Sequence, residues 1–207
     1  MGEPLLNVDA IVQRHAQWTK QWHEATTAPE LTAPWNAIES NHRMNFDVWH
    51  EEDIARRDDL GHERVYQAKR VIDRCNQARN DAMERIDVWL LGHLPPAPPD
   101  APLHSETPGM MIDRLSVLAL RSYHMRLEAE RECAGEEHRR KCHDRGRILE
   151  EQITDLKRCV EIVLARLQSG ELRFKLYKQL KMYNDPSLNP QLRARGTANA
   201  TSSSKPE

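Results

Sequence analysis

The stretch ETPGMMIDRLSVLALRSYHM, residues 106–125, is apolar on nearly every side of the helix that it predicts. A surface helix usually carries one apolar stripe, whereas this stretch has no continuous polar face before Arg121. Polar residues nevertheless recur within it, namely Asp113, Arg114, Ser116, Tyr123 and His124. Because buried charges need partners, we expect this helix to lie at the centre of a bundle whose other helices direct polar groups toward it.

The composition argues for helices and against several kinds of partner. Of the 207 residues, 30 are Lys or Arg and 32 are Asp or Glu, for a formal net charge of −2. This balance leaves no broad positive field, so we expect no nucleic-acid partner and no binding to an anionic membrane. Aromatic residues make up only 5%, and the abundance of Ala, Leu, Glu, Arg and Gln favours helix over sheet throughout.

The sequence has no signal for export or for insertion into a membrane. Residues 1–15 lack a basic segment followed by an apolar one, and no window approaches about 18 uninterrupted apolar residues. The four cysteines have no CxxC spacing. We therefore expect a cytoplasmic protein whose thiols are reduced.

Apolar residues at steps of three and four predict an all-α, single-domain bundle of five to six helices over residues 1–190. The predicted helices cover residues 4–25, 34–58, 63–92, 107–125, 147–167 and 172–183. Proline makes residues 95–106 an extended strap between helices. The polar tail, residues 191–207, is expected to be disordered.

Two antiparallel hairpins are expected around the buried central helix. In the first hairpin, both helices rise by about 1.5 Å per residue, so the numbers of two residues that face each other should sum to roughly 120. Asn41 is then expected to face Asn80. A turn at Gly135 would give sums of roughly 268 in the second hairpin and pair Asp113 with Asp155. If the helix instead continues through Gly135, these last pairings fail.

A heptad seam typical of a coiled coil is the clearest periodic signal of the chain. It comprises Leu149, Ile153, Leu156, Val160, Val163 and Leu167. We interpret this seam as internal packing, with a homodimer zipper as the alternative that the sequence leaves open.

Four ordered motifs resemble the bacterial domain-of-unknown-function 4254 family over roughly residues 35–190. They are WHEEDIARR (49–57), IDRCNQARND with the following ERID (72–87), the central stretch (106–125) and LKMYNDPSLNP (180–190). The resemblance implies a compact helical protein of the bacterial cytoplasm. It implies no activity, since the family has none to carry over.

Polar residues on the predicted inner faces could line a cleft between the two hairpins. A carboxylate beside a histidine can supply general acid–base chemistry, so the catalytic candidates are Asp113, His124 and Glu84. Arg114 could hold a carboxylate or phosphate in bidentate fashion. The ligand-binding candidates are Asn41, Asn45, Asp53, Asp73, Asn80, Asp81, Arg114 and Ser116. We expect the cleft to bind a small polar or anionic molecule, with hydrolytic turnover as a further option.

The alternative function is that of a structural or adaptor protein. The same polar residues could form a sealed network of salt bridges and amides that fixes the register of the helices. A water-accessible cavity that reaches Asp113, Arg114 and Asn80 would favour ligand binding. Complete mutual pairing of these groups would favour the structural role.

A divalent metal is the one cofactor that the sequence suggests, but the sequence does not identify the residues that would bind it. Glu39 and His42 form an ExxH pair of the kind that di-iron bundles use twice, but only one such pair is present. An irregular magnesium or manganese site could be completed by His50, Asp53, Asp81, Glu84 and Asp87. Acid-rich helices more often present solvated faces, so no metal ligand is predicted.

Overall fold

The computed structural model describes residues 5–25, 30–178, 187–191 and 193. The chain divides into two units, one ending at Leu176 and one beginning at Tyr177, and each is described by itself. In the second unit, Oδ1 of Asn189 accepts a hydrogen bond from the backbone N–H of Gln191 at 3.0 Å and so holds a turn. The candidate sites lie in the first unit.

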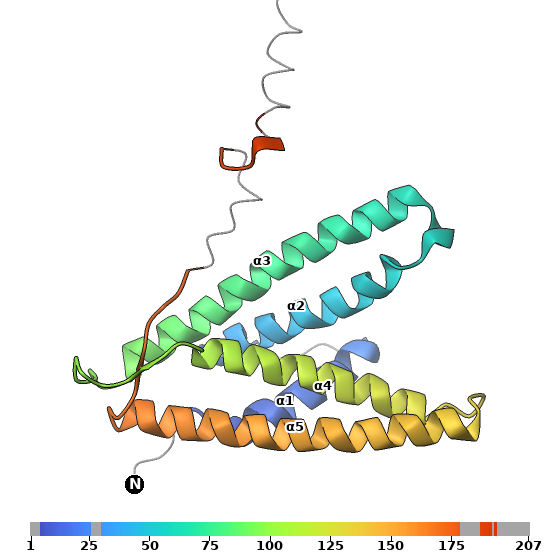
Figure 1. Ribbon diagram of the computed structural model, residues 1–207. Helices are drawn as coiled ribbons and strands as arrows, with labels where there is room; N and C mark the ends of the chain where they lie inside the picture. Colours follow the sequence, from blue (N-terminus) through green and yellow to red (C-terminus); the bar gives the residue numbers. More distant parts are fainter. Residues whose placement is uncertain (1–4, 26–29, 179–186, 192, 194–207) are drawn as a thin grey trace, which may run out of the picture. The chain divides into compact units, whose positions relative to one another are not determined.

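The first unit is all-α in its described residues, apart from one short pair of strands (Figure 1). Its elements are α1 (Val8–His23), α2 (Trp35–Ile54), the 3₁₀ helix η1 (Asp58–Leu60), α3 (His62–His93), β1 (Leu103–His104), α4 (Pro108–Glu130), α5 (Glu136–Gln168) and β2 (Arg173–Phe174). The predicted all-α bundle is thereby confirmed. Among the described residues, no helix combines the length and the apolar character needed to cross a membrane.

Helix α4 is the central helix of the bundle, because it packs against each of α1, α2, α3 and α5. Its start follows from the sequence: Thr107 accepts a hydrogen bond from the backbone N–H of Met110, and Pro108 takes the first helical position. Its largest buried apolar residues are Met111, Ile112, Leu115 and Leu120. One expectation was wrong, since the side chain of Arg114 is 59% exposed and gives this helix a solvent face about two turns earlier than predicted.

The first hairpin consists of α2 and α3, which lie side by side in Figure 1. Nδ2 of Asn41 lies 3.5 Å from the backbone carbonyl oxygen of Arg79, so the pair sums to 120 and the predicted register is correct to within one residue. Gly61 occupies the turn with φ of 80°, a conformation that glycine adopts without strain.

The second hairpin consists of α4 and α5, and its turn resolves the alternative that the sequence left open. Residues 131–135 are not helical, and Gly135 is the N-cap of α5. An ion pair between Glu128 and His138, at 2.9 Å, gives a sum of 266 and supports the predicted register. The predicted pairing of Asp113 with Asp155 was nevertheless wrong, because Asp113 faces α2 and α3. Successive helical residues point about 100° apart, so the register did not determine which face of α4 meets α5.

The segment after α5 is extended, which corrects the prediction of a helix from Leu172. Leu172 and Phe174 are buried in the core, and β2 pairs with β1 of the proline-rich strap in parallel register. The backbone N–H of Arg173 donates to the carbonyl of Pro102 at 3.0 Å, because the strap leaves carbonyl groups that no helix satisfies. Apart from this pair of two-residue strands, the described residues contain no sheet, as the composition predicted.

Some predictions concern residues that the structure does not describe. Residues 179–183 of the predicted last helix, and the tail apart from residues 191 and 193, lie outside the described residues. The single domain over residues 1–190 stays a prediction.

Gly109 allows α3 and α4 to approach each other closely. Its backbone N–H donates to Oδ1 of Asp87 at 2.7 Å, and the hydroxyl of Thr107 donates to the other carboxylate oxygen at 2.5 Å. A Cβ atom at Gly109 would lie 2.6 Å from the carbonyl oxygen of Met83 and 2.9 Å from Oδ1 of Asp87. The close packing therefore depends on the missing side chain.

Replacing Gly109 by alanine should lower the free energy of unfolding by about 2 to 3 kcal/mol, because α3 must move away and Asp87 loses a donor. Urea unfolding at pH 7 measures the change. Gly146→Ala is the matched control, since Gly146 lies inside α5 and its Cβ would meet nothing within 4 Å. There the better helix propensity of alanine should add about 0.5 to 1 kcal/mol. Equal effects of the two substitutions would contradict the packing argument.

Candidate functional site

A buried polar seam joins α2 to α4. It consists of Asn41, His42, Asn45, Asp113 and Ser116, each at most 6% exposed. Nδ2 of Asn41 and Nδ2 of Asn45 each donate to Oδ1 of Asp113 at 2.9 Å, and Asn45 also donates to Oγ of Ser116 at 2.9 Å. Arg79 of α3 adds an ion pair, with its Nε 3.2 Å from Oδ1 of Asp113. Donors from α2 and α3 thus compensate the charge that α4 brings into the core.

The hydrogen bonds of His42 within this seam suit a neutral imidazole. The hydroxyl of Thr19 donates to the carbonyl of His15 at 2.8 Å, so its oxygen accepts from Nε2 of His42 at 2.9 Å. Nδ1 of His42 then accepts from the hydroxyl of Ser116 at 2.7 Å. Burial lowers the pKa of His42 to about 3. Ser116 is therefore a buried donor and has no access to a substrate.

The seam is almost complete in itself. Among its five residues, Oδ1 of Asn41 is the one buried side-chain atom without a hydrogen-bond partner, and Nε of the adjoining Arg79 is held by its ion pair with Asp113 alone. None of its side chains lines the two pockets between α4 and α5 that are described below. This arrangement can fix the register of α2 against α4, and it uses the carboxylate of Asp113 within the protein.

The structure brings together four of the eleven predicted site residues, namely Asn41, Asn45, Asp113 and Ser116. The others lie elsewhere. Arg114, Asp73 and Asp81 contact near neighbours at 2.8 to 2.9 Å, namely Glu106, Lys69 and Gln77 respectively. Asp81 and Glu84 also line a separate pocket near the start of α2, and Asn80 is half-buried on α3. Asp53 lies at the opposite end of α2, and His124 of α4 is close to it. The prediction of a single cleft that holds all eleven residues is therefore wrong.

The acidic and ExxH metal hypotheses also fail on geometry. Both ring nitrogens of His42 are engaged by Thr19 and Ser116, so His42 offers no lone pair to an ion beside Glu39. Asp87 uses both carboxylate oxygens at the start of α4. Burial raises the pKa of Asp87 to about 6, although its two donors act in the opposite direction.

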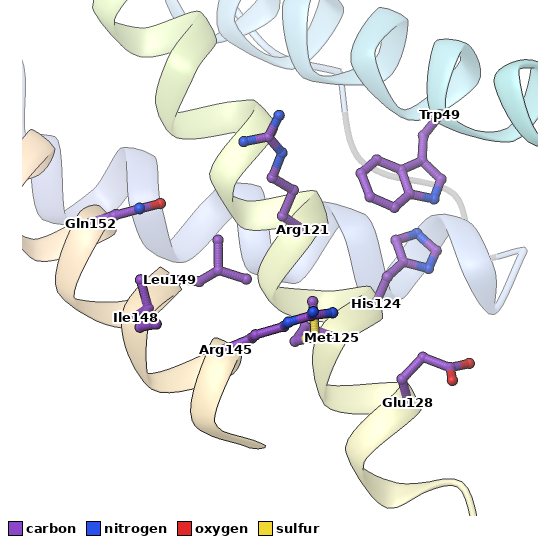
Figure 2. Close-up of a pocket in the computed structure, with 9 residues that line it drawn as sticks. All are labelled: Trp49, Arg121, His124, Met125, Glu128, Arg145, Ile148, Leu149 and Gln152. Atoms are coloured by element: carbon purple, nitrogen blue, oxygen red, sulfur yellow. The ribbon is translucent and has the colours of Figure 1, made fainter. Parts of the chain in front are cut away.

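A pocket of about 520 Å³ lies between α4 and α5, close to the end of α2 (Figure 2). Its apolar lining comes from Trp49, Met125, Ile148 and Leu149, and its polar lining from Arg121, His124, Glu128, Arg145 and Gln152. Figure 2 shows Arg145 extending from α5 toward α4 beside Met125, whereas Arg121 extends from α4 toward the α2 side. The volume is in the range of small-molecule sites.

A second pocket continues along the same helix pair. It has a volume of about 810 Å³ and shares Arg121 and Gln152 with the first. Arg114 lines this second pocket together with its partner Glu106. The face of the α4–α5 hairpin thus carries one long groove with apolar and cationic side chains, and Arg114 belongs to it and not to the buried seam.

Three histidines from three helices meet beside the first pocket. They are His23 at the end of α1, His50 of α2 and His124 of α4, and one ligand atom of each lies within 4.8 Å of the others. His124 lines the pocket as well. Burial, with His23 and His50 close by, lowers the pKa of His124 to about 4. These three residues, called the histidine cluster below, have the chemistry of metal ligands.

Sequence reasoning missed His23 and gave His50 only a secondary place. Both belong to helices with a clear apolar stripe, on which a histidine more often packs in the core than binds a ligand. The missing signal is tertiary, since nothing in the sequence says that the end of α1 lies next to α2 and α4. Trp49 and Arg145 were likewise missed as pocket residues, because each is an ordinary member of its helix.

A family described as "protein of unknown function (DUF4254)" matches residues 35–176. The chain belongs to this family. No curated protein and no solved structure matches the chain.

The DUF4254 match covers α2 to α5 and ends at Leu176, the last residue of the first unit. The residues that line the two pockets and the residues of the buried seam all fall inside it. Helix α1 falls outside, so His23 and Thr19 contact the family region from a segment that the match does not include.

Proposed function

We propose that this DUF4254 protein binds a small amphipathic anion in the pocket between α4 and α5. The apolar part of the ligand lies on Leu149 and Met125, and its anionic group pairs with Arg145. Arg121 adds positive potential from the α4 side. The proposal keeps the anionic ligand expected from the sequence and moves it from the buried seam to the groove.

The observation that carries the proposal is a pair of arginines without acidic partners. Among the residues that the structure describes, neither Arg121 nor Arg145 has a carboxylate oxygen within 4.0 Å, whereas Arg114 in the same groove pairs with Glu106. The acid that lines the pocket, Glu128, is already paired with Arg131 at 3.1 Å and with His138 at 2.9 Å. The unbalanced charge at the pocket is therefore positive.

The apolar lining supports an amphipathic ligand over an inorganic anion. Ile148 lines the pocket and is 54% exposed, and Ile162 lines the adjoining pocket and is 49% exposed. Burial of such side chains is favourable by about 25 cal/mol per Å² of apolar surface removed from water. A ligand with an apolar body and one negative group would use both features of the pocket.

The test is binding of 8-anilinonaphthalene-1-sulfonate, a fluorescent amphipathic anion, to the full-length protein. We expect Arg145→Gln to weaken binding about tenfold and Arg121→Gln to weaken it less, since a charge-assisted hydrogen bond contributes roughly 1.5 kcal/mol. Fluorescence titration at low and moderate ionic strength gives both dissociation constants.

Two controls make the result specific to charge at this pocket. N-phenyl-1-naphthylamine lacks the sulfonate, so its binding should not change in Arg145→Gln. Arg140→Gln removes an exposed arginine of the same helix that does not line the pocket, and it should leave binding of the anion unchanged. Equal loss for both probes, or equal loss in Arg140→Gln, would contradict the proposal.

For the buried seam, we propose the structural role. Its hydrogen bonds between α2 and α4, and the exposed fractions of at most 6%, support a network that sets the register of the helices. If the pocket binds no ligand, the seam only stabilises the bundle, and we propose that the protein then acts as an adaptor through its surface. The substitution at Asp113 argued below tests the seam separately from the pocket.

For location and other partners, we propose a protein of the bacterial cytoplasm that binds neither nucleic acid nor membrane surfaces. The formal charge of −2 supports the absence of these polyanionic partners. The heptad seam of α5 is used within the chain, since Leu156, Val160, Val163 and Leu167 are buried, and so it supports no zipper between two copies.

A further inference from the structure

We propose that His23, His50 and His124 bind one divalent transition-metal ion of the zinc type through three imidazole nitrogens. This inference does not rest on the anion proposal, although His124 borders both sites. Each of its steps uses the histidines and the residues that hold them.

The three imidazole rings face one another in a nearly equilateral arrangement. Their centroids lie 5.2 Å apart for His23 and His50, 5.3 Å for His23 and His124, and 5.8 Å for His50 and His124, and the rings are tilted by 53° to 66°. The ligand atoms lie within 4.8 Å of one another. Zinc–nitrogen bonds of about 2.1 Å at a tetrahedral angle need about 3.4 Å between nitrogens, so modest side-chain rotations close the site.

The hydrogen bonds of the histidines leave the metal-binding lone pairs free. Nδ1 of His23 donates to the carbonyl of Thr19 at 2.7 Å, and Nδ1 of His50 donates to the carbonyl of Phe46 at 2.8 Å. These bonds fix the tautomer in which Nε2 carries a lone pair, as backbone carbonyls do for metal-bound histidines. Nε2 of His124 is buried and, within the described residues, has no hydrogen-bond partner.

Aromatic side chains hold the rings in this arrangement. Trp49 stacks on His124 with 4.6 Å between centroids and 6° between planes, and Tyr123 stacks on His23 at 4.5 Å and 26°. Phe46 contacts His50 at 4.3 Å. Ligands that are ordered before the metal arrives lose less conformational entropy on binding, which raises affinity.

The donor set selects the class of metal. Three imidazoles without a carboxylate suit zinc, cobalt, nickel or copper, whereas magnesium and calcium prefer oxygen ligands. His23 is exposed, so the fourth coordination position faces solvent, as in zinc sites that keep an open position. The proposed ion therefore differs in class and place from the magnesium or manganese site that the sequence suggested.

The experiment is titration of the full-length protein, freed of metal with EDTA, with Co(II) and then with Zn(II). We expect one equivalent of Co(II) to give visible d–d bands without the near-ultraviolet band of thiolate ligation, and Zn(II) to displace it. His23→Gln should weaken Co(II) binding about 100-fold or more. Because His23 is exposed, this variant should fold, and circular dichroism checks that it does.

The matched control is His138→Gln, which removes a competing site. Nε2 of His138 lies 3.4 Å from Sγ of Cys142 and 2.9 Å from Glu128, a set that could also hold zinc. Unchanged Co(II) affinity in His138→Gln, with loss in His23→Gln and His50→Gln, supports the proposal. Loss in His138→Gln alone, a thiolate band, or absence of stoichiometric binding by the wild type would overturn it.

The metal proposal and the anion proposal can be refuted independently of each other. Arg145→Gln should keep the Co(II) affinity, and His23→Gln should keep the affinity for the fluorescent anion. Loss of Co(II) binding in Arg145→Gln would also overturn the assignment of the metal to these three histidines.

Discussion

Replacing Asp113 by alanine should lower the free energy of unfolding by about 3 to 5 kcal/mol, the largest effect expected of a single substitution in this protein. Its Oδ1 accepts from Asn41 and Asn45 at 2.9 Å and lies 3.2 Å from Nε of Arg79. Removal of the carboxylate takes the shared acceptor from one N–H of each of the two buried amides and leaves one cation without its partner. Urea unfolding at pH 7 measures the loss.

Asp155→Ala is the matched control. Asp155 is exposed on α5 and lines the groove beside Arg114, and its loss should change stability by no more than about 0.5 kcal/mol. Binding of the fluorescent anion should be the same in Asp113→Ala and the wild type under conditions where both are folded. A loss below about 1 kcal/mol for Asp113→Ala would refute the structural role of the seam.

The sequence predicted the bundle well because the bundle depends on local signals. Periodic apolar residues, the Thr107–Pro108 helix start and the glycine turns are all local, and each recurs in the structure. Register could also be predicted, since equal rises on two antiparallel helices fix it once the turn is known. The Asn41–Arg79 and Glu128–His138 contacts both fall within two residues of the predicted sums.

The site could not be predicted as well, because it depends on which face of a helix meets which neighbour. Asp113 and Arg114 are adjacent in sequence and were assigned to one cleft, yet Asp113 enters the core and Arg114 lies in the groove. Their side chains point about 100° apart around α4, and Asp113 is the buried one because its face of α4 meets α2 and α3. The segment from Leu172 shows the same limit. Its spacing of apolar residues predicted a helix, but Arg173 and Phe174 pair with the proline-rich strap, which is far away in the sequence.

Replacing His42 by glutamine should flatten the dependence of stability on pH by about 2 kcal/mol between pH 6.5 and 4.5. The folded pKa of His42 is lowered to about 3, whereas in the unfolded chain it is about 6.5. In this pH window the unfolded state therefore binds more protons, and stability falls as the pH is lowered. The slope rises from about 0.7 kcal/mol per pH unit at pH 6.5, where the unfolded histidine is half protonated, to about 1.4 kcal/mol per unit near pH 5, which gives the expected difference.

Two other groups also shape the wild-type curve. His15 has the same sign as His42, since burial and then the nearby His42 lower its pKa. Asp87 has the opposite sign, because its pKa is raised to about 6 and the folded state binds more protons as the pH falls through 6. The contribution of Asp87 is the same in the wild type and in His42→Gln and cancels in the comparison. The pKa of His15 is lowered less once His42 is absent, which flattens the curve of the variant in the same direction as the loss of His42 itself.

Urea unfolding in metal-free buffer at several pH values between 7 and 4.5 provides the measurement, with His62→Gln as the control. His62 is exposed at the start of α3, so its removal should leave the slope of the wild-type curve unchanged. Glutamine at position 42 can still donate to Thr19 and accept from Ser116, but it does not titrate. Parallel curves for wild type and His42→Gln would mean that folded His42 takes up a proton in this range. Nδ1 could then no longer accept from Ser116, and the hydrogen-bond directions assigned to the seam would be wrong.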